Sequence, residues 1–118
     1  MSDVTETCLF CRIGRGEIPA DIVHEDDLVV AFRDINPKAP THILLIPREH
    51  MYSAADLDET DAEMLGRLFS VAAQLARDAG IAERGFRLVT NSGPAAGQSV
   101  DHLHFHLMGG RSMGWPPG

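Results

Sequence analysis

Three of the chain's six histidines alternate with apolar residues in the segment His102-Leu103-His104-Phe105-His106, close to the end of the 118-residue sequence. Because side chains alternate faces along a strand, this spacing predicts three imidazoles on one face, with neighbours about 7 Å apart. Near neutral pH an imidazole can exchange protons, attack a phosphorus atom or bind a metal ion. A single small ligand could therefore contact His104 and His106 together.

Three interpretations of this histidine strand are open from the residues alone. The histidines could be solvent-facing polar residues of a half-buried strand. They could bind a metal ion, with Asp34 and His42 supplying further ligands from neighbouring strands. They could also act in nucleophilic catalysis on a phosphorylated ligand. The preceding loop favours this last interpretation, because Gly97-Gln98-Ser99 can direct backbone N–H groups and a hydroxyl at an anion.

Both cysteines lie in the segment Cys8-Leu9-Phe10-Cys11. In a cytosolic protein this spacing indicates half of a metal site or a redox pair, because structural disulfides are rare there. A redox pair is expected at the start of a helix that follows a core strand. Here the segment precedes every strand signal, which favours a metal site.

Composition and charge narrow the class of protein. The hydrophobic share of 44% and the charged share of 23% are typical of a globular domain, and the length suits one domain over residues 1–118. Ten basic and seventeen acidic side chains give a net charge of −7, which argues against nucleic acid as the main partner. The first residues do not resemble a signal peptide, and no long apolar stretch follows, so we expect a cytoplasmic protein without membrane association.

The elements that must position these residues are a hairpin, a buried strand, a long helix and two further strands. We expect a short helical turn at 8–15, strands near 22–24, 28–32, 41–47, 86–90 and 99–107, and a helix over 61–79. Thr60 and Glu63 form a capping-box pattern, and Gly80 fits the position just after the helix. The helical face expected to be core comprises Met64, Leu65, Leu68, Phe69, Ala72, Leu75 and Ala76. This order predicts an α+β class with a mainly antiparallel sheet.

The segment from His102 to Met108 resembles the His-φ-His-φ-His-φ-φ signature of the histidine-triad (HIT) superfamily. Further resemblance to HIT positions is found at residues 10–20, 32–35, 40–42, 46–47, 50 and 97–100, and the ending at 109–118 is similar to the Hint branch, the purine nucleoside phosphoramidases. The resemblance covers roughly residues 8–118. It implies a five-stranded, mainly antiparallel sheet with one long and one short helix, and a homodimer with a ten-stranded sheet. It leaves 1–7 as a flexible N-terminus and 109–118 as a tail.

The resemblance also implies an activity, namely hydrolysis of purine nucleoside 5′-phosphoramidates or acyl-nucleotides to the nucleoside monophosphate. His104 would be the nucleophile and would form a covalent nucleotidyl-histidine intermediate. His106, Ser99 and the backbone at Gly97 and Gln98 would hold the α-phosphate, and His42 would assist orientation or proton traffic near His104. The implied catalytic residues are therefore His42, Ser99, His104 and His106.

The remaining nucleotide contacts also follow from the resemblance. Asp34 would accept hydrogen bonds from the ribose hydroxyls with Ile35 beside it, and Asn91 would contact the phosphate or ribose. The base pocket would be lined by Phe10, Ile13 and Phe32. Apolar walls accept adenine and guanine alike, so AMP, GMP and their phosphoramidates are all expected ligands. Without the resemblance, the apolar residues could equally be core and Asp34 a turn residue.

A structural zinc ion is the one cofactor that the resemblance implies. Its ligands would be Cys8, Cys11, His50 and His102, a tetrahedral Cys₂His₂ set that takes no part in the chemistry. The alternative is a reduced thiol pair without metal. No cofactor is expected to be required for catalysis.

The sequence departs from the Hint pattern at two positions, and other activities stay open. Asp101 stands where an aromatic residue is common, and Gly114 stands before Trp115 where a histidine is familiar. The alternatives are a dinucleoside polyphosphate hydrolase or a nucleotidyltransferase of the same superfamily, a nucleotide-binding scaffold with little catalysis, and a metal-binding protein.

Overall fold

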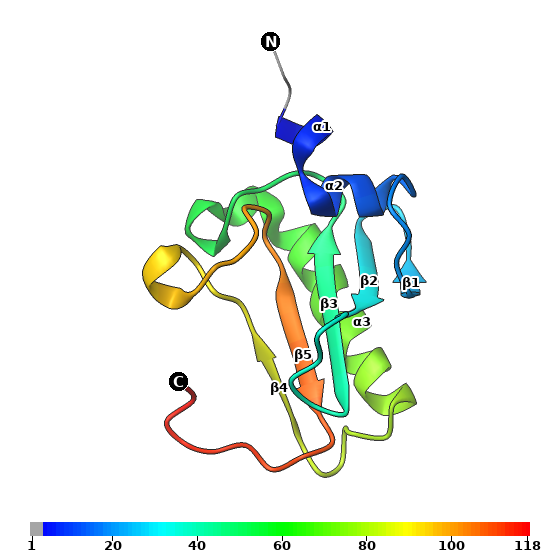
Figure 1. Ribbon diagram of the computed structural model, residues 1–118, viewed down its shortest axis with the longest axis vertical. Helices are drawn as coiled ribbons and strands as arrows, with labels where there is room; N and C mark the ends of the chain where they lie inside the picture. The colour runs from blue at the N-terminus through cyan, green and yellow to red at the C-terminus, as the bar shows by residue number, and fades with distance from the viewer. Residues whose placement is uncertain (1–3) are drawn as a thin grey trace.

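A computed structural model describes residues 4–118, and its central element is a five-stranded antiparallel sheet (Figure 1). The strand order is β1-β2-β3-β5-β4, and each neighbouring pair is antiparallel. The strands are β1 (Ile22–Glu25), β2 (Val29–Arg33), β3 (Thr41–Pro47), β4 (Phe86–Val89) and β5 (Phe105–Gly109). The predicted hairpin, the buried strand at 41–47 and the mainly antiparallel sheet are confirmed.

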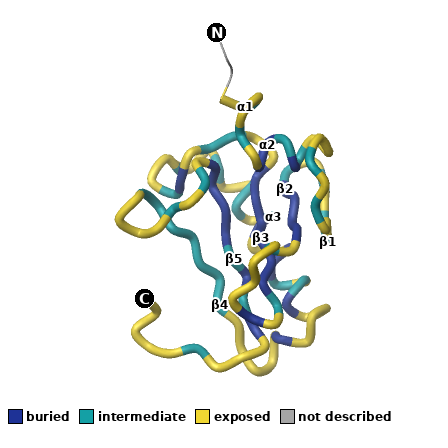
Figure 2. Tube along the Cα trace, in the orientation of Figure 1, coloured by how far each residue is buried: buried dark blue, intermediate teal, exposed yellow. Residues whose placement is uncertain are grey.

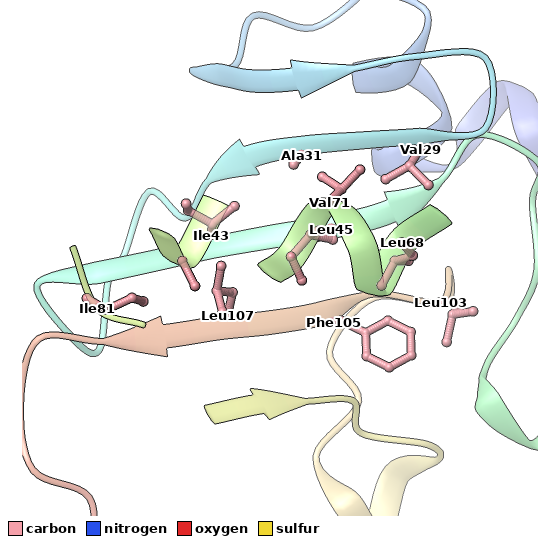
Figure 3. Packing of buried hydrophobic residues seen from close by; sticks show 12 residues of the cluster. Val29, Ala31, Ile43, Leu45, Leu68, Val71, Ile81, Leu103, Phe105 and Leu107 are labelled. Carbon is pink, nitrogen blue, oxygen red and sulfur yellow. The ribbon is translucent and has the colours of Figure 1, made fainter. Parts of the chain in front are cut away.

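Helix α3 (Ala62–Asp78) covers one face of the sheet and forms the larger core with it (Figure 3). On β5, Phe105 and Leu107 point to this face, as the alternation predicts, and Leu103 packs against it. The predicted apolar stripe of α3 is largely confirmed, with Phe69 as an exception at 52% exposed. The residues of the helix that are fully buried are Leu68, Val71, Ala72 and Ala76.

The start of α3 differs from the prediction. The Thr60–Glu63 capping box was wrong, because the reciprocal bonds are made by Asp58 and Asp61 around the 3₁₀ helix η2 (Glu59–Asp61). The Asp58 carboxylate accepts a hydrogen bond from the Thr60 N–H. Thr60 therefore lies inside η2 and is not the N-cap residue. The end agrees with the prediction, because Gly80 follows the C-cap with a φ of 74°.

The opposite face of the sheet carries a second, smaller core under the N-terminal segment. Helix α1 (Val4–Thr7) leads into α2 (Leu9–Gly14), which begins at the N-cap Cys8 and confirms the turn predicted at 8–15. The buried residues of this core are Phe10, Ile13, Val30, Phe32, Leu44 and Ile46. The flexible N-terminus predicted for 1–7 lies partly outside the described residues, and 4–7 form α1. Among residues 4–118, no helix is long and apolar enough to cross a bilayer.

Strand β5 is shorter than predicted, because it begins at Phe105 and not near Ser99. The register pairs Leu45 with Phe105, so continuation of the ladder would bring Pro47 opposite Leu103. Proline has no N–H to donate, and β3 ends there. The N–H of Leu103 instead donates to the carbonyl of Met51 at 2.6 Å. His102 and His104 therefore precede β5 and His106 lies within it, and the first two are buried. Figure 2 shows that β5 and its neighbour β3 are largely buried along their length.

Candidate active site

The ring of His104 is held in one tautomer by a backbone carbonyl. His104 is 3% exposed, and its Nδ1 lies 2.7 Å from the carbonyl oxygen of His102. A carbonyl oxygen can only accept a hydrogen bond, so the neutral ring carries its proton on Nδ1 and its lone pair on Nε2. The Thr90 hydroxyl donates to the carbonyl of His104 at 2.8 Å and fixes its backbone. An imidazole with an unprotonated Nε2 is the form that acts as a nucleophile.

His42 and His106 form a hydrogen-bonded pair beside His104, with Nε2 of His42 at 2.9 Å from Nδ1 of His106. The backbone N–H of Lys38 donates to Nδ1 of His42 at 3.0 Å, so the proton of His42 lies on Nε2. This Nε2–H donates to Nδ1 of His106, whose own proton is therefore on Nε2. His106 can offer that N–H to an anion.

Asp34, His42 and His106, here called the carboxylate–imidazole cluster, also form a group of possible metal ligands. Their ligand atoms lie within 4.8 Å of one another, and a carboxylate oxygen of Asp34 is 3.5 Å from Nε2 of His42. If Nε2 of His42 bound a metal, the proton would have to move to Nδ1, where the Lys38 N–H already points. The backbone therefore favours proton sharing over metal binding in this cluster.

Burial keeps the rings of this cluster neutral. Burial is the largest cause that lowers the pKa of His106 to about 4, and the neighbouring His104 and His42 act in the same direction. Burial also lowers the pKa of His42, although the Asp34 carboxylate opposes the shift. Neutral rings have one donor and one acceptor each, as the hydrogen bonds of His42 and His106 require.

His104 and His106 line a pocket of about 280 Å³ on the sheet face opposite α3. This volume is near the lower end of small-molecule sites, about 300 Å³. The ring of Phe10 meets the ring of His104 edge-on, with centroids 5.1 Å apart. The pocket brings together eight of the predicted nucleotide-binding residues: Phe10, Ile13, Phe32, Asp34, Ile35, Ser99, His104 and His106. Ile35 stands at the rim with 98% of its surface exposed.

The other three predicted nucleotide-binding residues, Asn91, Gly97 and Gln98, lie outside the lining of this pocket. Gly97 closes the 3₁₀ helix η3 (Pro94–Ala96) with a φ of 85°, a left-handed conformation that favours glycine. The N–H groups of Gly97 and Gln98 donate to carbonyls within the same loop. Ser99, which is exposed and lines the pocket, is the position of this loop that can donate to a phosphate.

The side chain of Gln98 holds this loop together. Its Oε1 accepts from the Gly93 N–H at 2.8 Å, and its Nε2 donates to the carbonyls of Tyr52 and Val100 at 2.7 and 3.0 Å. Gln98 is therefore a structural residue of the loop, and its carboxamide is not free to contact a ligand.

Cys8, Cys11, His50 and His102 come together in a second group, here called the thiol–imidazole cluster. Nδ1 of His102 lies 3.3 Å from the sulfur of Cys8 and 3.5 Å from that of Cys11, and Nδ1 of His50 lies 3.4 Å from the sulfur of Cys11. Zinc bonds of about 2.3 Å to sulfur and about 2.1 Å to nitrogen, at the tetrahedral angle, separate such atoms by roughly 3.6 Å. The distances therefore fit a tetrahedral zinc site.

The tautomer of His102 also suits a metal ligand. Its Nε2 lies 2.9 Å from the carbonyl oxygen of Pro47, so Nε2 carries the proton and Nδ1 directs its lone pair into the thiol–imidazole cluster. The N–H of Cys11 donates to the sulfur of Cys8 at 3.4 Å, which fixes the position of this sulfur. The four predicted zinc ligands are thus brought together by α2, the segment after β3 and the segment before β5.

The model of the HIT domain family matches residues 15–113 of this chain. The chain belongs to the HIT family. The HIT fold implied by the sequence is confirmed by a solved structure, a HIT family hydrolase from Legionella pneumophila, with a TM-score of 0.92 and 50% identity. The match covers 94% of this chain and 99% of that one.

Two relatives of this HIT chain carry informative names. The purine nucleoside phosphoramidase of Escherichia coli K12 is 50% identical over 111 residues, which cover 94% of this chain and 93% of the relative. The 14 kDa zinc-binding protein of Zea mays is 50% identical over 112 residues, which cover 93% of this chain and 87% of the relative.

Sequence reasoning missed the groups that hold the HIT histidines in place. These are the hydroxyl of Thr90, the N–H of Lys38 and the carbonyls of Pro47 and His102. Three of the four are backbone groups, which almost any residue type could supply. Only Thr90 carries a side-chain signal, and a threonine at the end of a strand is too common to single out. The position of His42 also differs from the prediction, which placed it beside His104. Its ring contacts that of His106, and the ring of His106 in turn contacts that of His104.

Proposed function

We propose that this HIT protein hydrolyses purine nucleoside 5′-phosphoramidates or acyl-nucleotides through a nucleotidyl intermediate on His104. The observation that carries the proposal is the fixed tautomer of His104, whose Nδ1–H donates to the His102 carbonyl while Nε2 retains a lone pair. The pocket that His104 lines also contains His106, a neutral N–H donor. The name of the Escherichia coli relative, purine nucleoside phosphoramidase, supports the same reaction.

Substrate binding follows from the chemistry of the pocket walls. The apolar side chains around Phe10 and Phe32 suit a purine ring, and the Asp34 carboxylate suits the two hydroxyls of a ribose. Nε2–H of His106 and the donors of Ser99 would hold the phosphate oxygens. Asn91 would contact the ribose or phosphate from the end of β4, once a ligand extends beyond the pocket.

In the first chemical step, Nε2 of His104 forms a bond to phosphorus and the bond from phosphorus to the leaving group breaks. The leaving amine carries away the electron pair and takes a proton from the solvent side of the pocket. In the second step, water attacks the phosphorus, loses a proton, and breaks the bond to Nε2, which releases the nucleoside monophosphate. His106 stabilises the negative charge on the phosphoryl oxygens in both steps, and His42 keeps His106 in the donor tautomer.

The thiol–imidazole cluster would hold a structural zinc ion in this proposal. Two thiolates and two imidazoles form a closed coordination shell, so bound zinc would join the N-terminal helix to the start of β5. The relative from Zea mays named a zinc-binding protein supports this assignment.

We also propose that the protein is a homodimer in which two sheets join through their β4 edges. Strand β4 is an edge strand, and Phe69 and Phe86 are 52% and 40% exposed. The tail is bound on the same side, since Arg87 donates to the carbonyl of Gly114. Sedimentation should give a mass of twice 12.9 kDa for the wild type and a monomer for Phe86→Glu. A monomeric wild type would contradict the dimer.

The activity is tested with adenosine 5′-phosphoramidate and the variant His104→Ala. Loss of the nucleophile should lower kcat by about 10⁴-fold or more while AMP still binds. The matched control is His24→Ala, whose ring contacts Asp26 on the β1–β2 hairpin. Mass spectrometry after rapid quenching should locate a nucleotidyl group on His104. Unchanged turnover in His104→Ala would show that the proposed mechanism is wrong.

A further inference from the structure

His102 is shared between the two functional parts of this molecule. Its ring belongs to the thiol–imidazole cluster, where Nδ1 faces the sulfurs of Cys8 and Cys11. Its carbonyl oxygen accepts the Nδ1–H of His104, the hydrogen bond that leaves Nε2 unprotonated. The candidate metal site and the nucleophile are therefore separated by the covalent bonds of a single residue and one hydrogen bond.

We propose that metal binding at the thiol–imidazole cluster positions the nucleophile, with His102 as the positioning residue. The proposal rests on the proposed function, because it assigns to zinc a control over the same His104 chemistry. Cys8, Cys11 and His50 act on His104 only through His102, so none of them is a catalytic residue.

The position of the His102 carbonyl depends on how firmly its ring is anchored. One nitrogen of the ring is held by the Pro47 carbonyl at 2.9 Å, and the other faces the cluster. With zinc bound, both nitrogens are fixed, and the bond from the Leu103 N–H to Met51 fixes the next peptide. Without zinc, the cluster side of the ring has thiol contacts of 3.3–3.5 Å, which are weak hydrogen bonds, and an edge-on contact with the ring of His50.

His104 has little means to compensate if that carbonyl moves. Its ring is 3% exposed, so water cannot readily replace the carbonyl as an acceptor for Nδ1–H. Thr90 holds the backbone of His104 but not its ring. The ring would then rotate or shift its proton to Nε2, and a proton on Nε2 removes the lone pair that attacks phosphorus. A displacement of about 1 Å at a reacting group is enough to cost about 100-fold in rate.

The test compares two substitutions of His50, a cluster ligand that is distant from the nucleophile in sequence. His50→Ala removes a ligand, whereas His50→Cys keeps one. Both full-length variants are prepared with zinc as the only added metal, and the zinc content is measured. Nitrogen-15 NMR of the imidazoles at neutral pH then reports whether His104 is protonated at Nδ1 or Nε2. A matched control is Val71→Ala, which opens a cavity in the core under α3, on the other face of the sheet.

For His50→Ala we expect loss of zinc, a mixture of His104 tautomers, and a kcat lower by about 10- to 100-fold with AMP affinity unchanged. His50→Cys should retain zinc and restore both the tautomer and kcat. Val71→Ala should lower thermal stability without changing the His104 spectrum. Removal of zinc from the wild type with a chelator should reproduce the His50→Ala spectrum, which covers the case where that variant does not fold.

The inference is overturned if zinc-free protein keeps the Nδ1–H tautomer and full kcat, or if the wild type binds no zinc. These outcomes differ from a failure of the proposed function. In that case zinc would still change the His104 spectrum, but neither form would turn over the phosphoramidate.

Discussion

The thiol–imidazole cluster and the carboxylate–imidazole cluster each contain two histidines, yet the backbone gives them opposite properties. In the first, the Pro47 carbonyl accepts the Nε2–H of His102, so a lone pair faces into the cluster. In the second, the Lys38 N–H donates to Nδ1 of His42, so a proton faces into the cluster. A lone pair binds a metal ion, whereas a proton can be donated to a neighbouring ring or passed along a chain of hydrogen bonds.

Residue type alone therefore does not separate a candidate metal site from a candidate catalytic site. Both clusters present three or more ligand atoms within 4.8 Å of one another. The discriminating group is a backbone carbonyl in one case and a backbone N–H in the other. A search for metal sites should therefore ask what binds the outer nitrogen of each histidine.

The largest expected effect concerns the metal itself. Cys8→Ser should lose stoichiometric zinc, whereas Asp34→Asn should retain it. If free zinc exceeds its Kd by 1,000-fold, the loss should lower the free energy of unfolding by about 4 kcal/mol. Elemental analysis measures the zinc content, and urea denaturation with and without zinc measures the free energy of unfolding. Equal zinc loss in the two variants would remove the distinction between the clusters.

A smaller effect is expected for His42→Asn, which removes the donor to Nδ1 of His106. His106 can then carry its proton on Nδ1, which directs the wrong nitrogen at the phosphate. We expect kcat to fall by about 100-fold, with zinc content and AMP affinity unchanged. His24→Asn serves as the control at a hairpin position. If AMP affinity falls as much as kcat, His42 acts in binding and not in positioning His106.

The smallest effect is a pH dependence that belongs to His106. Burial lowers its pKa from 6.5 to about 4, so between these values the unfolded state binds the proton and the folded state does not. The contribution of His106 to stability is therefore complete above pH 6.5, is lost as the pH falls toward 4, and changes no further below that. An NMR titration should give a His106 midpoint near pH 4, and His106→Asn should reduce the slope of stability against pH in this window. A midpoint near 6.5 would contradict the buried, neutral ring.

Much of the fold follows from local patterns in the sequence. The apolar repeat from Met64 to Ala76 predicted α3, and the run Ile43-Leu44-Leu45-Ile46 predicted the central strand β3. Alternation also placed Phe105 and Leu107 under the helix. These features depend on burial of side chains, which residue type encodes directly.

The start of β5 and the cap of α3 could not be predicted in this way. The first depends on Pro47 lying opposite Leu103, which requires the register of two strands distant in sequence. The second depends on a choice between two overlapping capping patterns, one at Asp58 and one at Thr60. At the site, the residue types were found, but the tautomers were not, because carbonyl and N–H groups of Pro47 and Lys38 determine them.

The three hydrogen bonds of Gln98 have a consequence for the thermodynamics of ligand binding. They tie the loop before the histidine strand to Tyr52, Gly93 and Val100 through contacts within the protein itself. Fixing the backbone of one residue costs about 1–2 kcal/mol of conformational entropy, and here that cost falls on folding and not on association. The loop should therefore receive a phosphate as a rigid surface. Gln98→Ala should make binding entropically less favourable, because the carboxamide that orders the loop is removed.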